Sequence, residues 1–361
     1  MTGGGVFPAL AVLQAVKAKT SEVLWIGSQG GMESRLLKDQ DIRFETIPAA
    51  GLHGVGLLSF PGNMLKLFRG FQQVKKIIRD FKPDVMFFTG GYLGVPAAYA
   101  GRLIPSIVFV PDIEPGLALR EIIRSAQAVA VSVPDSKAFI KHPQMRVSGY
   151  PVRKELSRWT RREARKHFGM DEKDKVLLVF GGSKGARSIN QALISQLEEV
   201  LKTMHVIHIS GRDNWEETQA QIQTLDETEG ARYHAFPFLE EEMGAAFAAA
   251  DLAVCRAGAS TLGELPLFGL PAILIPYPHA WRYQYQNAEY LQSHGGARIL
   301  KDEDLEEQLL PVVMELINDK KQLAGMRAAI RSLSQPNAAE VIADMIVQAG
   351  QKTRTKEALY G

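Results

Sequence analysis

Residues 256–288 combine the residue types and spacing that a site for a negatively charged ligand requires. Small residues at 257–261 precede a helical pattern that contains Glu264, and a buried apolar strand and a polar loop at 284–288 follow. In an open parallel sheet, such a unit places its loops and the helix N-terminus at the edge where ligands bind. Because a helix N-terminus carries partial positive charge, this edge favours an anion.

A second segment, Gly181 to Ala186, has the context of a phosphate-binding loop. It follows the apolar run 175–180 and opens a helical pattern that extends through Leu201. Backbone N–H groups in such a turn can contact phosphate oxygens directly. The glycine spacing is neither that of a Walker A loop nor that of a complete Gly-x-Gly-x-x-Gly fingerprint, so we expect a bound diphosphate rather than ATP hydrolysis or NAD binding.

A third glycine-rich segment, Thr2 to Gly5, runs directly into a helical pattern that Pro8 can begin. Such a loop ordinarily follows a strand, and in doubly wound sheets the first strand is usually central. No strand pattern precedes these glycines. We therefore expect that the N-terminal domain lacks its first strand, through a truncated or misassigned start.

Alternating apolar runs and helical patterns must position these segments. The expected strands are residues 22–27, 44–48, 84–89, 106–110, 128–132, 145–148, 175–180, 205–210, 233–236, 252–255, 272–275 and 297–300. This alternation predicts an α/β fold with two doubly wound parallel-sheet domains that face each other across a cleft. We expect an N-terminal domain at residues 1–150, a C-terminal domain at 151–340, and a helix end with a tail at 341–361.

The composition is that of a globular protein, with 46% apolar and 23% charged residues. The single cysteine, Cys255, lies in an apolar run, which predicts a buried core residue and excludes a disulfide framework or a Cys-based metal site. No apolar run reaches the roughly 18 residues that cross a bilayer, and the N-terminus is no signal peptide. From these features we expect a cytosolic protein.

Charge is distributed unevenly along the chain. Residues 1–150 carry 17 Lys and Arg against 11 Asp and Glu, whereas residues 151–361 carry 25 against 29. Within the basic half, residues 57–80 interleave aromatic and aliphatic side chains with five cations. This segment is either a core-facing helix with a solvated basic face or a contact with an anionic membrane surface. The positive first half favours the membrane contact, and we expect no nucleic-acid partner.

Taken together, the glycine-containing segments resemble a known family. Thr2 to Gly4, Gly182 to Ala186 and Arg256 to Glu264 occur in the order and spacing of the GT-B glycosyltransferases of the MurG type, and the resemblance covers essentially the whole chain. Those inverting enzymes transfer N-acetylglucosamine from UDP-N-acetylglucosamine (UDP-GlcNAc) to the undecaprenyl-linked muramyl-pentapeptide of bacterial peptidoglycan synthesis, converting lipid I to lipid II. Residues 6–12 and 149–153 favour this branch over the lipid glycosyltransferases of the same fold.

The resemblance implies a GT-B fold, hexosyltransferase activity, no cofactor or metal besides the donor substrate, and a peripheral location on the cytoplasmic side of the cell membrane. It assigns the ribose hydroxyls to Glu264, the diphosphate to the amides around Ser183, uracil to the backbone of Leu239 and the sugar hydroxyls to Gln284. The remaining substrate-binding positions that it implies are Thr2, Gly3, Gly4, Asp112, Arg153, Asn190, Ala259, Ser260, Thr261, Leu262 and Gly263.

Three departures from the family pattern fall on the acceptor side. Gly5 replaces the family's histidine, residues 109–112 replace His-Glu-Gln-Asn, and Tyr283 replaces the first of two glutamines. With that histidine absent, Asp112 is the first candidate for the general base and Glu114 the second, because both lie on the loop after an apolar strand. Alternatively, Asp112 caps the following turn.

Three other functions fit the same patterns. The chain could be another UDP-sugar-dependent lipid glycosyltransferase, a UDP-GlcNAc 2-epimerase of the same two-domain architecture, or a UDP-GlcNAc-binding homologue without activity. Incubation with UDP-GlcNAc and the lipid-linked acceptor separates them, because a transferase releases UDP only with acceptor and an epimerase forms N-acetylmannosamine.

Overall fold

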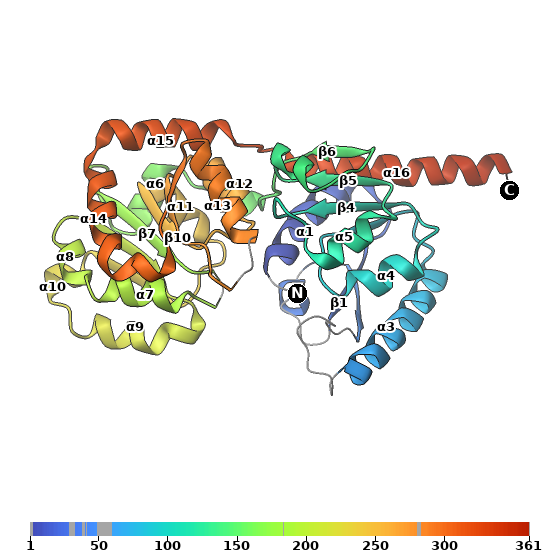
Figure 1. Ribbon diagram of the computed structural model, residues 1–361, viewed down its shortest axis with the longest axis horizontal. Helices are drawn as coiled ribbons and strands as arrows, with labels where there is room; N and C mark the ends of the chain where they lie inside the picture. Colours follow the sequence, from blue (N-terminus) through green and yellow to red (C-terminus); the bar gives the residue numbers. More distant parts are fainter. Residues whose placement is uncertain are drawn as a thin grey trace. The chain divides into compact units, whose positions relative to one another are not determined.

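The computed structural model describes residues 3–28, 33–37, 40, 42–48, 60–182, 184–279 and 283–360. Contacts divide the chain into two compact units, which are residues 1–152 with 336–361 and residues 153–335 (Figure 1). Both units are α/β and every strand pair in them is parallel. The predicted fold class, two doubly wound parallel-sheet domains of the GT-B type, is confirmed.

The second unit is built on one six-stranded sheet. In spatial order its strands are β12 (Ala297–Ile299), β11 (Ala272–Leu274), β10 (Leu252–Cys255), β7 (Val176–Phe180), β8 (His205–Ile209) and β9 (Tyr233–Phe236). The strand order changes direction between β7 and β10, so this pair is the topological switch point of the sheet. Every residue of β7, β10 and β11 is buried, including Cys255 as expected.

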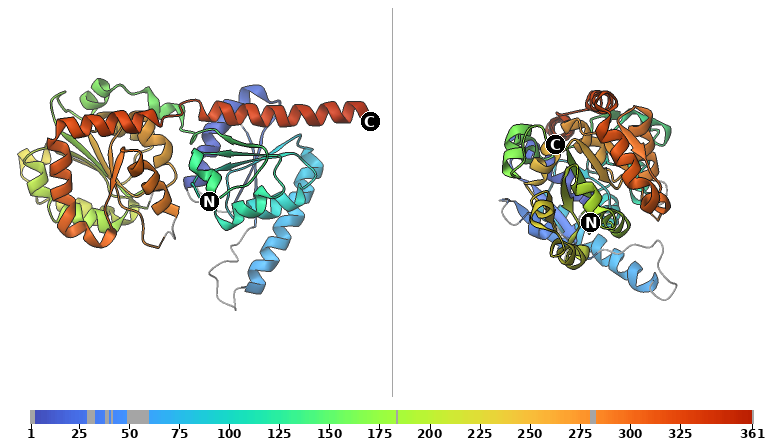
Figure 2. Two further views of the ribbon diagram at one scale, coloured as in Figure 1. Left: turned by 45° about the horizontal axis from the view of Figure 1, so that its top comes forward. Right: turned by 90° about the vertical axis from the view of Figure 1, so that its left-hand side faces the viewer.

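Helices flank both sides of this sheet, as Figure 2 shows. They are α6 (Arg161–His167), α7 (Arg187–Ile194), α8 (Leu197–Leu201), α9 (Trp215–Ile222), α10 (Glu227–Gly230), α11 (Met243–Ala249), α12 (Thr261–Phe268), α13 (Tyr283–Ser293), α14 (Leu305–Asn318) and α15 (Lys320–Ser332). Leu177 and Val179 of β7 share one apolar cluster with Ile189 of α7 and Leu309 of α14. Uninterrupted apolar strands of this kind are typical of parallel sheets that are covered on both faces.

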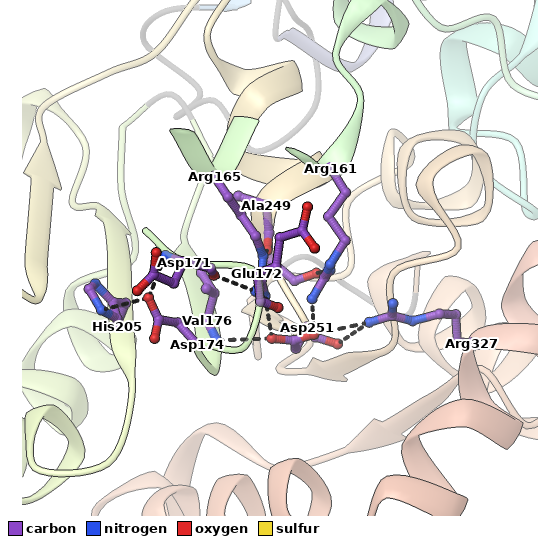
Figure 3. Close-up of polar contacts among 11 residues, drawn as sticks. Arg161, Arg165, Asp171, Glu172, Asp174, Val176, His205, Ala249, Asp251 and Arg327 are labelled. Atoms are coloured by element: carbon purple, nitrogen blue, oxygen red, sulfur yellow. Dashed lines mark hydrogen bonds and ion pairs between the residues drawn. The ribbon is translucent and has the colours of Figure 1, made fainter. Parts of the chain in front are cut away.

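An ion-pair network fixes the amino ends of the central strands (Figure 3). Asp251, directly before β10, accepts hydrogen bonds from the backbone N–H of Val176 (3.0 Å) and from Nη2 of Arg165 (2.9 Å), and it pairs with Arg161 and Arg327. The buried Arg165 also donates to three backbone carbonyls. Because its members are bonded to one another and to the backbone, the network serves structure rather than ligand binding.

The first unit contains two separate sheets. The smaller pairs β1 (Leu24–Ser28) with β2 (Arg43–Ile47), and the larger has the order β3 (Met86–Phe88), β4 (Ser106–Val110), β5 (Ala128–Val131) and β6 (Met145–Val147). The helices are α1 (Gly3–Val16), α2 (Glu33–Leu36), α3 (Phe60–Phe81), α4 (Gly94–Ala100), α5 (Leu117–Ile123) and α16 (Ala338–Tyr360). The first element of the described chain is the helix α1, and the first described strand follows it.

The C-terminal helix α16 belongs to the first unit. We expected a second domain that ends at residue 340 and a separate tail, whereas residues 338–360 form one helix that packs on α1 and β4. Ile342, Ala343 and Ile346 bury its inner face, and Lys19 in the short 3-10 helix after α1 forms an ion pair with Asp344 at 2.6 Å. Apolar burial therefore holds the end of the chain against its beginning.

Candidate functional site

The carboxyl ends of β7 and β10 bring together the two loops that the sequence singled out. Residues 181–186 follow β7 and residues 256–260 follow β10, and Phe180 and Cys255 are register partners in adjacent strands. The loop at 210–214 follows β8 at the same edge of the sheet. Open α/β sheets bind ligands in the crevice outside the carboxyl ends of the strands at such a switch point.

The loop after β7 has a backbone geometry that requires glycine. Gly185 has a φ of +86°, and a Cβ atom there would lie 2.0 Å from the carbonyl oxygen of Ser210. Its N–H donates to the carbonyl of Gly182 at 2.9 Å, which closes the turn. Gly182 has a φ of +87°, and a Cβ atom there would meet nothing within 4 Å. The loop thus packs against Ser210 on one side and leaves open space beside Gly182 before α7 begins.

Arg256 connects the loops of four strands. Its Nη2 donates to Oγ of Ser188 (2.8 Å), its Nη1 donates to the carbonyl of Ile275 (3.3 Å), and the guanidinium forms an ion pair with Asp302. The guanidinium carbon lies 5.2 Å from the ring centroid of Tyr277. Sequence reasoning did not find this role, because its partners come from three separate segments, which follow β7, β11 and β12.

Glu264 lies in the first turn of α12. Its N–H donates to the carbonyl of Ser260 (2.8 Å), and its side chain is only partly exposed. Burial raises the pKa of Glu264, whereas a hydrogen bond from Ser260 and the charge of Arg153 act in the opposite direction. The structure therefore places Glu264, Ser260 and Arg153, three positions that the resemblance assigned, within interaction range of one another.

The segment 284–288, expected to be a polar loop, is instead the start of α13. Gln284 accepts a hydrogen bond at Oε1 from the N–H of Tyr277 (2.9 Å), and the buried Asn287 donates to the carbonyl of Ala257 (3.1 Å). Asn287, Ala288 and Leu291 are buried at helical spacing, and their packing outweighs the polar composition of the segment. Helix α13 therefore braces the loops after β10 and β11.

Asn190 lies behind the glycine loop rather than in the crevice. It is 1% exposed, donates to the carbonyl of Ser210 (2.8 Å) and pairs with Nε2 of His208 (3.1 Å). Burial lowers the pKa of His208 to about 3, so this histidine is neutral and can act as a hydrogen-bond partner without charge. We interpret Asn190 as a residue that positions the loop at Ser210.

The other assigned positions divide into those that the structure describes and those that it does not. Leu239 is partly buried in the segment after β9. The short run Ala259, Ser260, Thr261, Leu262 and Gly263 forms the turn into α12, where Oγ1 of Thr261 donates to the carbonyl of Gly258 at 2.7 Å. Gly3 and Gly4 form the first turn of α1. Thr2 and Ser183 lie outside the described residues.

The two base candidates of the first unit differ in environment. Glu114 is 2% exposed and forms an ion pair with Arg120, whose Nε also donates to the carbonyl of Pro115 (3.0 Å). Asp112, on the same loop after β4, is partly exposed. A buried carboxylate that an arginine already engages is poorly placed to accept a substrate proton, so Asp112 is the better candidate.

Comparison with known proteins assigns the chain to a family. Residues 2–131 match the N-terminal domain of glycosyltransferase family 28, and residues 176–342 match its C-terminal domain. The chain belongs to glycosyltransferase family 28. A family member from Roseiflexus sp. (strain RS-1), named UDP-N-acetylglucosamine--N-acetylmuramyl-(pentapeptide) pyrophosphoryl-undecaprenol N-acetylglucosamine transferase, is 36% identical over 96% of this chain and 92% of its own. A protein of the same name from Halothermothrix orenii is 33% identical over 96% of both chains.

Solved structures are also similar to this family 28 chain over nearly its whole length. MurG of Acinetobacter baumannii superposes with a TM-score of 0.72 at 30% identity and covers 96% of both chains. A putative UDP-N-acetylglucosamine 2-epimerase from Listeria monocytogenes superposes with a TM-score of 0.67 at 12% identity, which shows a shared fold alone. The sheet edge at the β7–β10 switch point is therefore the donor-site candidate of a family 28 glycosyltransferase.

Proposed function

We propose that this family 28 protein is an inverting hexosyltransferase that moves N-acetylglucosamine from UDP-GlcNAc to the undecaprenyl-linked muramyl-pentapeptide, the step from lipid I to lipid II in peptidoglycan synthesis. The observation that carries the proposal is the position of Glu264 in the first turn of α12, which follows the β10 loop at the switch-point edge of the second unit. Relatives that are named for this reaction align with nearly the whole chain, which supports the choice of donor and acceptor.

The crevice offers a partner for each part of the donor. Backbone N–H groups at 182–186 and the N-terminus of α7 would bind the diphosphate, and the carboxylate of Glu264 would accept hydrogen bonds from both ribose hydroxyls. The backbone of Leu239 would contact uracil. Gln284 accepts from Tyr277 through Oε1, so its amide nitrogen is the group that would donate to the sugar hydroxyls.

The reaction needs a base on the acceptor side and charge stabilisation on the donor side. The acceptor hydroxyl attacks the anomeric carbon from the face opposite UDP, the bond between that carbon and the diphosphate oxygen breaks, and UDP leaves with the electron pair. We assign the hydroxyl proton to Asp112 and the stabilisation of the leaving diphosphate to the peptide dipoles of the two loops. The proposal assigns no step to a metal or cofactor, and the described residues contain no group of three or more His, Cys, Asp or Glu suited to a metal ion.

One assay tests this assignment. The protein is incubated with UDP-GlcNAc, with and without lipid-linked muramyl-pentapeptide, and UDP and N-acetylmannosamine are quantified. We expect UDP release that depends on the acceptor. Release of N-acetylmannosamine would assign the protein to the epimerases, and donor binding without either product would leave a homologue without activity.

We also propose that α3 binds an anionic membrane surface on the cytoplasmic side. Met64, Leu65 and Phe68 are 47%, 50% and 58% exposed, and helical spacing places them on one side of α3, whereas the buried Val74 and Ile77 lie on another. Basic side chains accompany them along the helix, namely Lys66, Arg69, Lys75, Lys76 and Arg79. An apolar edge with flanking cations fits anionic headgroups, to which each cation contributes about 1 kcal/mol. The described part of the chain has no helix long and apolar enough to cross a membrane.

Vesicle sedimentation tests the membrane proposal. We expect the protein to sediment with vesicles that contain phosphatidylglycerol and to remain in the supernatant with phosphatidylcholine alone. The variant L65S/F68S should lose most of this binding, whereas Leu103→Ser removes a 91% exposed leucine of the same unit that is not part of α3 and should change nothing. Equal binding by L65S/F68S and the parent protein would show that α3 does not bind the membrane surface.

A further inference from the structure

A chain of buried polar side chains runs behind the donor-site edge of the second unit. Its members are Tyr233 of β9, His208 of β8 and Asn190 of α7, which are 7%, 0% and 1% exposed. The Tyr233 hydroxyl lies 2.6 Å from Nδ1 of His208, and Nε2 of His208 lies 3.1 Å from Oδ1 of Asn190. We call these three side chains the buried polar chain. Because a buried polar group is costly when it lacks a partner, each member depends on its neighbour.

The last acceptor of the buried polar chain fixes the direction of every hydrogen bond in it. The carbonyl oxygen of Ser210 can only accept, and Nδ2 of Asn190 donates to it at 2.8 Å. The Oδ1 atom of Asn190 then faces His208 and can also only accept, so Nε2 of His208 carries the ring proton. Nδ1 of the same ring is left to accept from the hydroxyl of Tyr233.

Burial keeps both titratable members of this chain neutral. It lowers the pKa of His208 to about 3 and raises the pKa of Tyr233 above its ordinary value. At neutral pH the tyrosine therefore keeps its O–H donor, and the histidine keeps one donor and one acceptor. The direction of the hydrogen bonds, from Tyr233 toward Ser210, does not change over the range in which the protein is handled.

The end of the buried polar chain presses on the glycine turn of the donor site. A Cβ atom on Gly211 would lie 2.1 Å from the backbone nitrogen of Gly185, so the loop after β8 is in direct contact with the turn. Nδ2 of Asn214 in this loop lies 3.3 Å from the carbonyl oxygen of Lys184 and 3.4 Å from that of Ser210. A shift of the Ser210 carbonyl would therefore displace the turn at 184–186.

We propose that His208, with the proton on Nε2, is a positioning residue for the donor site. It orients the amide of Asn190, which holds the Ser210 carbonyl, and the loop at 210–214 in turn fixes the glycine turn and the start of α7. His208 acts through these groups rather than on the donor itself. This inference rests on the proposed function and deepens it, because it assigns the shape of the diphosphate-binding turn to a residue behind it.

Two substitutions of His208 in the full chain test the role of the Nε2 proton. His208→Gln keeps an N–H donor near the position of Nε2, whereas His208→Leu removes the donor to Oδ1 of Asn190. Calorimetric titration with UDP measures the donor site without the acceptor. We expect the Kd for UDP to rise about 10-fold in H208L and to stay within about 3-fold of the parent in H208Q. Equal affinity of H208L and the parent protein would overturn the proposal.

A destabilising substitution elsewhere in the second unit controls for a purely structural effect. Leu201, 1% exposed, ends α8 just before β8, at the edge of the sheet opposite the donor site. Leu201→Ala should lower the thermal midpoint at least as much as H208L, because it leaves a cavity in the core. The Kd for UDP should not change. A loss of UDP affinity in L201A as large as that in H208L would mean that reduced stability, and not the position of the turn, explains the effect.

Hydrogen exchange separates this inference from the proposed function. Without any ligand, the amides at 184–186 should exchange faster in H208L than in the parent protein, and H208Q should resemble the parent. If the parent protein binds no UDP, the proposed function fails, whereas exchange at these amides still decides whether His208 positions the turn. Equal exchange at 184–186 in H208L and the parent would exclude this role.

Discussion

The two units use the same kind of sheet but differ at its centre. In the second unit β7 and β10 are adjacent and fully buried, and the loops that follow them form the donor-site candidate. In the first unit β1 and β3 belong to separate sheets, and residues of both line an apolar cavity. Two of the three departures from the family pattern, Gly5 and residues 109–112, also fall in the first unit, whereas Tyr283 lies in the second. Donor binding and transfer are therefore separable properties of this molecule.

The largest effect should come from the base candidate of the first unit. Asp112→Asn removes the proton acceptor, and general-base catalysis contributes about 10²–10⁴-fold, so turnover should fall by that factor. Affinity for UDP-GlcNAc should not change, because Asp112 lies in the unit that does not carry the donor-site candidate. The measurement is the rate of UDP release together with calorimetric donor affinity. The control is the replacement of an exposed aspartate of the same unit, Asp135→Asn. An unchanged rate in D112N would exclude Asp112 as the general base.

The second prediction compares the ion pairs of the two units. Asp251→Ala leaves Arg161, Arg165 and Arg327 without their shared carboxylate, and breaking a buried pair costs about 3–5 kcal/mol of unfolding free energy. Asp344→Ala breaks the exposed pair with Lys19, which is worth about 0–1 kcal/mol. Urea denaturation, monitored by hydrogen exchange in each unit, measures the loss of unfolding free energy in both variants. Similar losses for D251A and D344A would show that the network does not stabilise the second unit.

Much of the fold could be predicted from the sequence, because buried parallel strands are uninterrupted apolar runs. The run at 175–180 became β7 almost unchanged, whereas the run at 84–89 kept only Met86–Phe88 as strand. Helix α13 was missed because Tyr and Gln alternate at its start and conceal the buried face of Asn287 and Leu291. The packing of α16 on α1 joins the two ends of the chain, and no local pattern encodes a contact over that separation.

Sequence alone singled out the candidate-site residues that belong to a local motif. It did not single out those whose roles depend on partners that the fold brings together from distant segments. Glu264 and the glycine turn at 181–186 were found because each belongs to a motif of small residues before a helix. The roles of Arg256 and Asn190 depend on partners such as Ser188, Asp302 and His208, which come from other loops and strands.

The third prediction tests how strictly the glycine loop is packed. Gly185→Ala puts a Cβ atom 2.0 Å from a backbone oxygen that cannot move freely, in addition to an unfavourable positive φ. We expect the loop to shift and donor affinity to fall by roughly 30-fold, about 2 kcal/mol. Gly169→Ala is the matched control, since its φ is +69° but a Cβ atom there meets nothing within 4 Å. It should cost about 1 kcal/mol of stability and leave calorimetric donor affinity unchanged.

The smallest expected effect belongs to the ribose contact of the second unit. Glu264→Ala removes a charged hydrogen-bond acceptor worth about 1.5 kcal/mol, so UDP-GlcNAc affinity should fall by roughly 10-fold. Because burial raises the pKa of Glu264, affinity in the parent protein should also decline on acidification at a higher pH than an ordinary glutamate would cause. Glu307→Ala, an exposed glutamate of α14, should bind the donor normally and keep the parent pH profile. Near-normal donor affinity in E264A would mean that the second unit binds the nucleotide through the glycine loop without this carboxylate.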